Sequence, residues 1–304
     1  MMRRSAFWGL AVLAIALAVA AGVTGAARAR AGTQNVCPGG KVRFGVEPYD
    51  TGPKFTNAYK ALTKVLSQKL GCSVQLVVTN NYTAEVEAMR AGKLDVAEFG
   101  PLGYIFAHKL AKAQIVAVFG TMQHKPVTYT AAIWVPNGSP ITTVSDLAGH
   151  SLALSDPAST SGNLYPLYAL ITHHVPVNSV HIEYAGGHPQ SLLALVNGKV
   201  DAAEVNSQQQ ATATAAGQFD TSKFHVLWRS DPIPNDPITV RGNLSPAFRA
   251  ALKKALFKLT PAQLKLVDTE LGVDSGPLIP AKDSLFKTIR AIVNLEHLKI
   301  SQIG

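Results

Sequence analysis

The sequence predicts an α/β fold made of two similar lobes, and two observations carry this prediction. Short apolar runs typical of strands alternate along the chain with segments of helical spacing, which favours parallel sheets. The segment AGKLDVAEF (91–99) returns as NGKVDAAEV (197–205), and an apolar-periodic helix precedes each copy. We therefore expect two lobes that fold alike, with a ligand site at the carboxyl ends of their strands.

Residues 1–31 are expected to be a secretion signal that is not part of the fold. Arg3 and Arg4 precede a long apolar run, and small residues mark cleavage sites near Ala29 or Ala31. The alternative is a retained membrane anchor, because the run is nearly long enough to span a bilayer. We expect cleavage, and therefore an exported, periplasmic protein.

The charge of the chain argues against a nucleic-acid partner. The formal net charge is +9, but residues 1–31 hold four arginines and no acid, so the remainder carries only +5. Neither a basic stripe nor interleaved aromatic residues accompany this excess. A hydrophobic content of 47% is ample for a packed core, and we expect a monomer.

Two cysteines remain after the signal, in a compartment that permits disulfides. Cys37 lies just before the strand-like run 41–46, and Cys72 lies just before the run 73–78. If these two strands are parallel neighbours, both thiols lie at the same end of the sheet. A disulfide is then expected; the alternative is two separate buried thiols.

The other elements follow from the same patterns in chain order. A helix over 55–70 ends at Gly71, which serves as a C-terminal cap, and the next helix takes Thr83 as its N-cap. Strands are expected at 41–46, 73–78, 94–99, 114–119, 130–135, 151–155, 181–185, 200–205 and 225–229. Further helices are expected near 101–112, after residue 162, and at 190–197, 245–259, 261–270 and 282–295.

The stretch SDPASTSGNLYP (155–166) starts a helix with three consecutive hydroxyl side chains, Ser159, Thr160 and Ser161. One hydroxyl satisfies an N-cap, so three suggest another purpose. A helix N-terminus carries free N–H groups and partial positive charge, and Gly162 allows the backbone to approach closely. We interpret the loop as a cradle for a small oxyanion; the alternative is an over-capped helix in a Ser/Thr-rich turn.

Tyr82 and His188 occupy equivalent places in the two copies of the repeat, ten residues before its glycine. Both follow a strand and lead into a helix, so they would face the crevice from opposite lobes. The alternative for His188 is that it merely caps the helix that begins at Pro189.

Several motifs together resemble the phosphonate/phosphite-binding proteins of ABC importers. They are DPASTSG, AGGH (185–188), GKVDAAEVNS (198–207), IPNDP (233–237) and the segment 80–104. The resemblance covers most of 41–245 and implies a two-lobed, type II-like periplasmic binding protein fold. Each lobe would be a mostly parallel sheet flanked by helices, with the ligand cleft between the lobes. Lobe one would comprise 38–127 plus 232–304, and lobe two 128–231.

Position by position, the resemblance implies ligand-binding roles for Tyr82, Tyr129, Ser159, Thr160, Ser161, His188 and Asp236. A carboxylate such as Asp236 repels a fully deprotonated anion but accepts a hydrogen bond from one that keeps an acidic proton. Phosphite and alkylphosphonates keep such a proton over part of the neutral range, and sulfate does not. Without the resemblance, Tyr129 would be read as a core residue and Asp236 as an ordinary turn residue.

Two positions depart from the family pattern. Relatives that take aminoalkyl phosphonates can pair the ligand ammonium with an acidic residue, and the matching position here is Gln208. This predicts a preference for ligands without an amine, such as phosphite or methylphosphonate. Glu98 stands where the family usually has an apolar or aromatic residue. We expect it to be a solvated charge at a strand end; the alternative is that it narrows the pocket.

The resemblance implies a binding protein that captures a small phosphorus oxyanion and delivers it to an ABC permease in the inner membrane. For such a binding protein we expect no catalytic residue and no cofactor. We also expect no metal site, because His173 and His174 are adjacent and cannot share a helix face. The alternative is an exported phosphohydrolase with a serine nucleophile in 159–161. That chemistry needs a base held against the serine, and no nucleophile elbow is visible.

Overall fold

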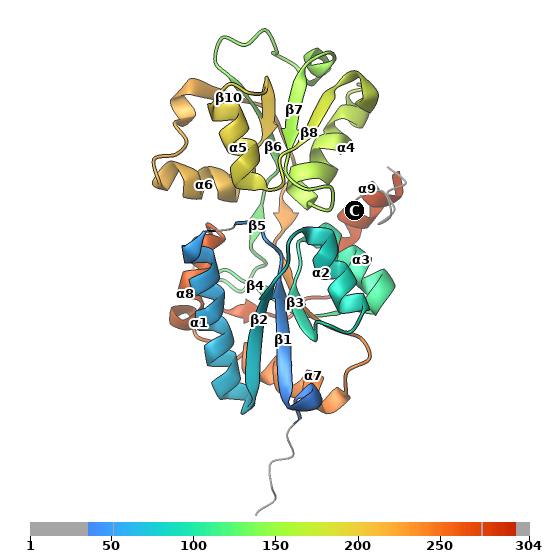
Figure 1. Ribbon diagram of the computed structural model, residues 1–304, viewed down its shortest axis with the longest axis vertical. Coiled ribbons are helices and arrows are strands. Elements are labelled where there is room, and N and C mark those ends of the chain that lie inside the picture. The colour runs from blue at the N-terminus through green and yellow to red at the C-terminus, as the bar shows by residue number, and fades with distance from the viewer. Residues whose placement is uncertain (1–35, 51, 275, 296–304) are drawn as a thin grey trace, which may run out of the picture. The chain divides into compact units, whose positions relative to one another are not determined.

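Two β-sheets, each flanked by helices, organise the chain (Figure 1). The structure is a computed structural model that describes residues 36–295 apart from residues 51 and 275. The described residues belong to one compact unit, Asn35–Gly304. We call the six-stranded sheet with its helices lobe one, and the five-stranded sheet with its helices lobe two.

Lobe one has the strand order β13-β4-β12-β3-β1-β2. Its strands are β1 (Lys41–Val46), β2 (Ser73–Val78), β3 (Val96–Glu98), β4 (Gln114–Phe119), β12 (Pro237–Val240) and β13 (Leu278–Ile279). Strands β1, β2 and β3 are parallel, whereas β12 is antiparallel to both of its neighbours. The sequence patterns had not indicated β12 or β13.

Lobe two has the order β10-β6-β9-β7-β8. Its strands are β6 (Ala132–Pro136), β7 (Ser151–Leu154), β8 (His181–Tyr184), β9 (Ala202–Glu204) and β10 (Phe224–Arg229). Here β6 alone runs opposite to the other strands, whereas in lobe one both β12 and β13 run opposite to β1–β4. A two-stranded ribbon of β5 (Thr128–Tyr129) and β11 (Ile233–Pro234) lies where the chain passes between the lobes (Figure 1).

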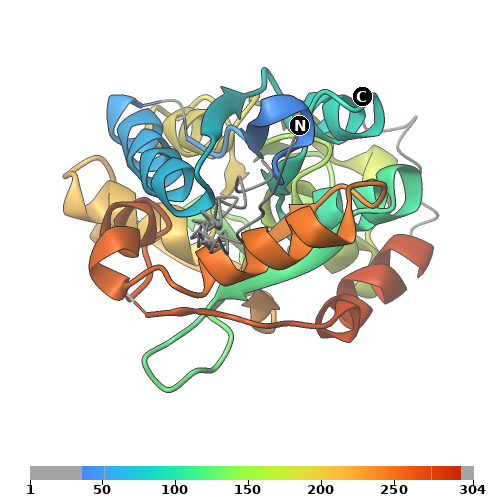
Figure 2. The same cartoon turned by 90° about the horizontal axis from the view of Figure 1, so that it is seen from below.

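The helices divide between the two lobes. Lobe one carries α1 (Pro53–Leu70), α2 (Tyr82–Arg90), α3 (Pro101–Ala111), α7 (Pro246–Leu256), α8 (Pro261–Glu270) and α9 (Lys287–Leu295). Lobe two carries α4 (Tyr165–Thr172), α5 (His188–Val196) and α6 (Ser207–Ala215). The C-terminal helices return to lobe one, where α8 packs beside α1 and α9 packs beside α3 (Figures 1 and 2).

The core of lobe one forms on both faces of its sheet. Alternate residues of β1, namely Val42, Phe44 and Val46, are buried on the face that α1 covers, as the two-residue period of a strand requires. Gly45 faces the other side, where a Cβ atom would lie 2.6 Å from the Leu94 side chain. Strand β1 is therefore packed from both faces and holds its carboxyl end firmly.

The internal repeat has a structural explanation. Asp95 accepts a hydrogen bond of 3.0 Å from the Arg43 backbone N–H on β1, and Asp201 accepts one of 2.8 Å from the Ser151 backbone N–H on β7. In both lobes this aspartate ties the strand after the helix to its parallel neighbour. The two halves therefore fold alike where the sequence repeats.

Some expectations are confirmed and others are wrong. The Cys37–Cys72 disulfide is present, because β1 and β2 are parallel neighbours that bring both cysteines to one end of the sheet. The N-cap of α2 is Asn81 rather than Thr83; its side chain accepts the Ala84 N–H at 2.7 Å, and the helix already begins at Tyr82.

The expectation of a solvated Glu98 is also wrong. Its side chain is buried and accepts a hydrogen bond of 2.6 Å from the Tyr59 hydroxyl. Strand β3 lies inside the sheet between β1 and β12, and Tyr59 of α1 lies against the glutamate at its end. None of the helices that the structure describes is long and apolar enough to cross a membrane. The expected signal, 1–31, lies outside the described residues.

Candidate functional site

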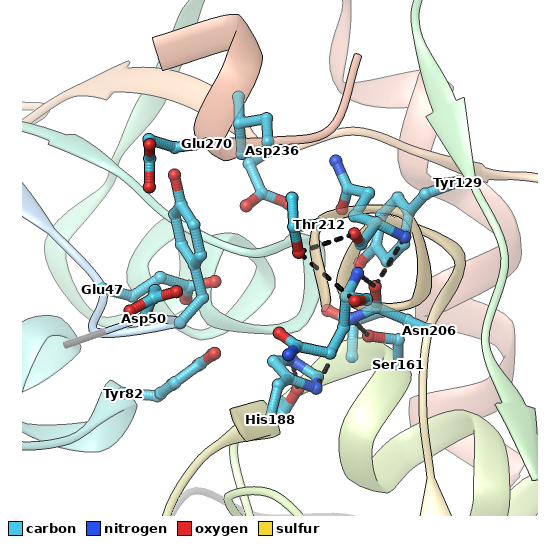
Figure 3. A pocket seen from close by; sticks show the side chains of 16 residues that line it. Glu47, Asp50, Tyr82, Tyr129, Ser161, His188, Asn206, Thr212, Asp236 and Glu270 are labelled. Atoms are coloured by element: carbon cyan, nitrogen blue, oxygen red, sulfur yellow. Dashed lines mark hydrogen bonds between the residues drawn. The ribbon is translucent and has the colours of Figure 1, made fainter. Parts of the chain in front are cut away.

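One cavity gathers polar side chains from both lobes (Figure 3). It is lined by Glu47, Tyr49, Asp50, Tyr82, Tyr129, Ser159, Thr160, Ser161, His188, Asn206, Gln208, Gln209, Thr212, Asp236, Glu270 and Leu271. The centre of a water molecule can occupy about 40 Å³ of it. That is room for ordered water, or for one small oxyanion in its place.

All eight residues expected to bind ligand line this cavity, including Gln208. Tyr82 and His188 lie on different sides of it, as the repeat suggested (Figure 3). Their placement together is a finding, and their contact with ligand stays a prediction.

The three hydroxyls of the loop after β7 each have a different partner. Ser159 is the N-cap of a π-helical turn (Thr160–Leu164), and its Oγ accepts the Gly162 N–H at 3.1 Å. Ser161 accepts a hydrogen bond of 3.2 Å from Asn206 Nδ2 and is also hydrogen-bonded to the Tyr129 hydroxyl. The loop is therefore more than an over-capped helix start.

Thr160 and Asp156 of this loop contact lobe one. Thr160 Oγ1 accepts the Leu102 backbone N–H at 2.9 Å, and the Asp156 carboxylate accepts the Tyr82 backbone N–H. Both amides belong to the first turns of helices, α3 and α2, where backbone N–H groups have no acceptor within the helix. The loop thus joins the two lobes by satisfying these amides.

Gly162 is required by a close approach within lobe two. A Cβ atom at this position would lie 1.8 Å from Ser155 Oγ and 2.9 Å from His188 Cε1. A side chain there would displace the histidine ring from the cavity wall. The close backbone approach expected from the sequence is therefore made to the protein's own Ser155 and His188.

His188 is held as a hydrogen-bond donor. Its Nδ1 lies 2.7 Å from Glu204 Oε1, and its Nε2 lies 3.4 Å from Ser159 Oγ on the cavity side. Burial works to lower the pKa of His188, but Glu204 together with Asp236 and Asp156 outweighs it and raises the pKa above 6.5. The ring is not a helix cap; Gly187 is the N-cap residue of α5. A protonated His188 presents Nε2–H to the cavity.

Lobe one and the connecting segment supply the opposite wall. Glu47, Asp50 and Tyr82 lie on one side of the cavity, and Asp236 lies between the two walls (Figure 3). The Tyr82 hydroxyl is buried and has no hydrogen-bond partner. Burial raises the pKa of Asp236 to about 7, although the nearby His188 works to lower it. This wall offers carboxyl and phenol groups.

Sequence reasoning missed several lining residues. Asn206 directly follows β9, and its side chain accepts the N–H groups of Gln208 and Gln209 at 2.9 Å each as the N-cap of α6. Glu47 directly follows β1. Both stand at carboxyl ends of strands, so the rule that singled out Tyr82 and His188 could have found them. Glu270 lies at the end of α8, far along the chain, and had no local signal.

Comparison with known proteins identifies the family. Residues 44–286 match the family model described as "ABC transporter, phosphonate, periplasmic substrate-binding protein". The chain belongs to this family of phosphonate-binding proteins. Its members are periplasmic, and therefore exported, substrate-binding proteins of ABC transporters. The two-lobed fold agrees with that of a solved member.

Individual relatives of this family cover most of the chain. The phosphonates-binding periplasmic protein of Escherichia coli (strain K12) is 27% identical over 289 residues, 84% of this chain and 85% of that protein. The phosphate-import protein PhnD of Mycolicibacterium smegmatis (strain ATCC 700084 / mc(2)155) is 28% identical over 217 residues, 68% of each. The solved structure of PhnD1 from Prochlorococcus marinus (MIT 9301), in complex with methylphosphonate, has a TM-score of 0.76 at 19% identity; 86% of this chain and 99% of that chain are covered.

Proposed function

We propose that this phosphonate-binding protein captures a small phosphorus oxyanion, such as phosphite or methylphosphonate, and delivers it to the permease of an ABC importer. The observation that carries the proposal is the division of the cavity into a donor wall and an acceptor wall. Ser159, Ser161, Asn206 and protonated His188 offer donors to oxyanion oxygens. Asp236 offers an acceptor to an acidic P–OH group.

The size of the cavity favours the smallest members of this ligand class. About 40 Å³ for water centres accommodates a single tetrahedral group with a small substituent. Gln208 lines the cavity and brings no charge to an amine. Leaving an ammonium unpaired in a closed cleft costs several kcal/mol. We therefore expect methylphosphonate to bind better than aminoethylphosphonate.

A calorimetric panel on the purified protein tests this function. It contains phosphite, hypophosphite, phosphate, methylphosphonate, aminoethylphosphonate and sulfate. We expect saturable binding of phosphite or methylphosphonate, and at least about tenfold weaker binding of aminoethylphosphonate. Tenfold tighter binding of the amine would refute the ligand preference. No heat from any phosphorus oxyanion would refute the function itself.

A hydrolase is the second candidate, because Ser159, His188 and Glu204 form a serine–histidine–carboxylate line. However, Ser159 Oγ already accepts the Gly162 N–H, and a histidine that keeps its proton donates and cannot act as general base. We therefore propose that the protein is not an enzyme. Turnover of a phosphoester that is lost in Ser159→Ala would overturn this.

The cellular setting follows from the same proposal. We propose that residues 1–31 direct export to the periplasm and are removed near Ala29 or Ala31. The mature protein acts as a monomer that meets its permease in the inner membrane. An intact mass of the exported protein that still includes residues 1–31 would contradict the cleavage.

A further inference from the structure

Glu47 lines the cavity and has one buried carboxyl oxygen without a hydrogen-bond partner. It directly follows β1, and only 4% of it is exposed. The backbone N–H of Gly100, the N-cap residue of α3, is hydrogen-bonded to this carboxylate. Oε2 has no hydrogen-bond partner, although the side chain lines the cavity (Figure 3). A buried, unpartnered oxygen is costly unless a ligand satisfies it.

The charges around Glu47 are carboxylates. Burial raises its pKa well above 4.5, and the nearby Asp236, Glu85 and Asp156 raise it further. Asp50 and Glu270 line the same cavity. Among the described residues, the lining holds no lysine or arginine.

The remaining titratable groups of the cavity do not compensate this charge. His188 stands on the opposite wall and is paired with Glu204. Burial raises the pKa values of Tyr49, Tyr82 and Tyr129 well above 10, so these phenols stay neutral. Burial raises the pKa values of both Glu47 and Asp236, so the shared proton can come from the ligand or from one of these carboxyl groups. An anion therefore fits this wall only when one acidic proton lies between it and the two carboxyl groups.

We propose that Glu47 is a specificity residue that, with Asp236, selects the singly charged, protonated form of the phosphorus oxyanion by accepting the ligand's P–OH hydrogen bond at Oε2. This inference rests on the proposed function and narrows its ligand class. The deprotonated oxygens of the ligand face the hydroxyl, amide and imidazolium donors of lobe two. The complex of protein and ligand contains the same number of protons whether the shared proton resides on the ligand or on Glu47.

A dependence on pH follows. If only the protonated anion is competent, the apparent dissociation constant is the intrinsic one divided by the protonated fraction. The apparent affinity for methylphosphonate then falls about tenfold per pH unit once the pH exceeds both the second pKa of the ligand and the raised pKa values of Glu47 and Asp236, because no group then supplies the shared proton. Hypophosphite has a single charge but no acidic proton, so it binds more weakly than phosphite.

The test compares Glu47→Gln with a matched control, Glu98→Gln. Glu98 is a buried carboxyl of the same lobe that does not line the cavity. Binding of methylphosphonate is measured by calorimetry from below its second ionisation to well above it, with phosphite, hypophosphite and sulfate alongside. In wild type and Glu98→Gln we expect the steep pH dependence. In Glu47→Gln we expect the apparent affinity to fall by no more than about threefold per pH unit. We also expect a smaller ratio of phosphite affinity to sulfate affinity.

A second variant guards against misfolding. Glu47→Asp keeps the carboxyl with a shorter reach, so it should weaken binding and retain the steep pH dependence. An unchanged slope and unchanged selectivity in Glu47→Gln would overturn the inference, as would a flat pH profile in wild type. Tight aminoethylphosphonate binding that is lost in Glu47→Gln would also overturn it, because Glu47 would then pair with an ammonium. If wild type binds no phosphorus oxyanion at all, the proposed function fails, and this inference fails with it.

Discussion

Thr160→Val should weaken ligand binding by breaking a bond between the lobes. Thr160 Oγ1 accepts the Leu102 N–H at 2.9 Å, and both residues are buried. Valine has nearly the shape of threonine but no acceptor, so the Leu102 N–H is left unsatisfied when the lobes are together. When the lobes separate, water can satisfy this amide. The cost therefore falls on the ligand-bound, closed form.

The expected magnitude follows from the buried amide. A buried donor without a partner costs about 1–3 kcal/mol, and about 1.4 kcal/mol corresponds to tenfold in affinity. We expect binding to be weakened by roughly fivefold to 150-fold, with a change of no more than about 0.5 kcal/mol in the free energy of unfolding of the ligand-free protein. Calorimetry measures the affinity. Small-angle scattering should show a smaller radius of gyration with ligand, because a ligand that binds the closed form more tightly shifts the population towards that form.

The matched control is Thr63→Val. Thr63 is also buried, but its hydroxyl donates to the Tyr59 carbonyl within α1, away from the lobe contact. It should leave the affinity unchanged. If Thr160→Val binds as wild type does, or if it lowers the stability of the ligand-free protein by as much as it lowers the affinity, the contact does not act in closure and the reasoning is wrong.

Two further variants test the fold and the specificity. Asp95→Asn should lower the free energy of unfolding by about 3 kcal/mol, because the fully buried carboxylate pairs with Arg43 at 2.7 Å and Arg241 at 2.9 Å. These arginines overcome the effect of burial and hold the Asp95 pKa below 3.8, so wild type loses this stabilisation as pH falls through the folded-state value. Denaturant unfolding at acid and neutral pH should therefore show the two proteins converging at acid pH, and a constant gap would contradict the pairing. Gln208→Glu should improve aminoethylphosphonate binding and impair methylphosphonate binding by about tenfold each, measured by calorimetry, and equal affinities for both proteins would remove Gln208 from the specificity argument.

The internal repeat allowed much of the fold and two residues of the site, Tyr82 and His188, to be predicted. Its glycines take left-handed conformations after α2 and α5, at φ 70° for Gly92 and 63° for Gly198. Spacing alone placed Tyr82 and His188 at the entries to these helices, and in the structure they are the first helical residues. These are local features of backbone geometry, so a local pattern can reveal them. The resemblance to relatives added Tyr129 and Asp236, which have no distinctive local pattern.

The remaining parts of the site depend on contacts between distant segments. The partner of Thr160 is an amide 58 residues earlier, and the partner of Asp156 is the Tyr82 amide of the other lobe. Glu98 looked like an exposed strand end because nothing in its neighbourhood along the chain shows that Tyr59, from α1, covers it. Tertiary packing decides the environment of such carboxyls, and a single sequence does not reveal it.

The repeat also explains why the two walls of the cavity differ in chemistry. Tyr82 and His188 begin equivalent helices, and Glu98 and Glu204 end equivalent strands. In lobe two the glutamate bonds the histidine at the helix start, which keeps the ring charged and aims a donor into the cavity. In lobe one Glu98 accepts a hydrogen bond from Tyr59 instead, so the Tyr82 hydroxyl has no partner. Burial raises the pKa of Tyr82, so this hydroxyl stays neutral. The difference between Tyr82 and His188 on a repeated framework thus gives one wall with an imidazolium donor, paired behind with Glu204, and another wall with phenol and carboxyl groups. An anion that is deprotonated on one side and protonated on the other can bind between them in only one orientation.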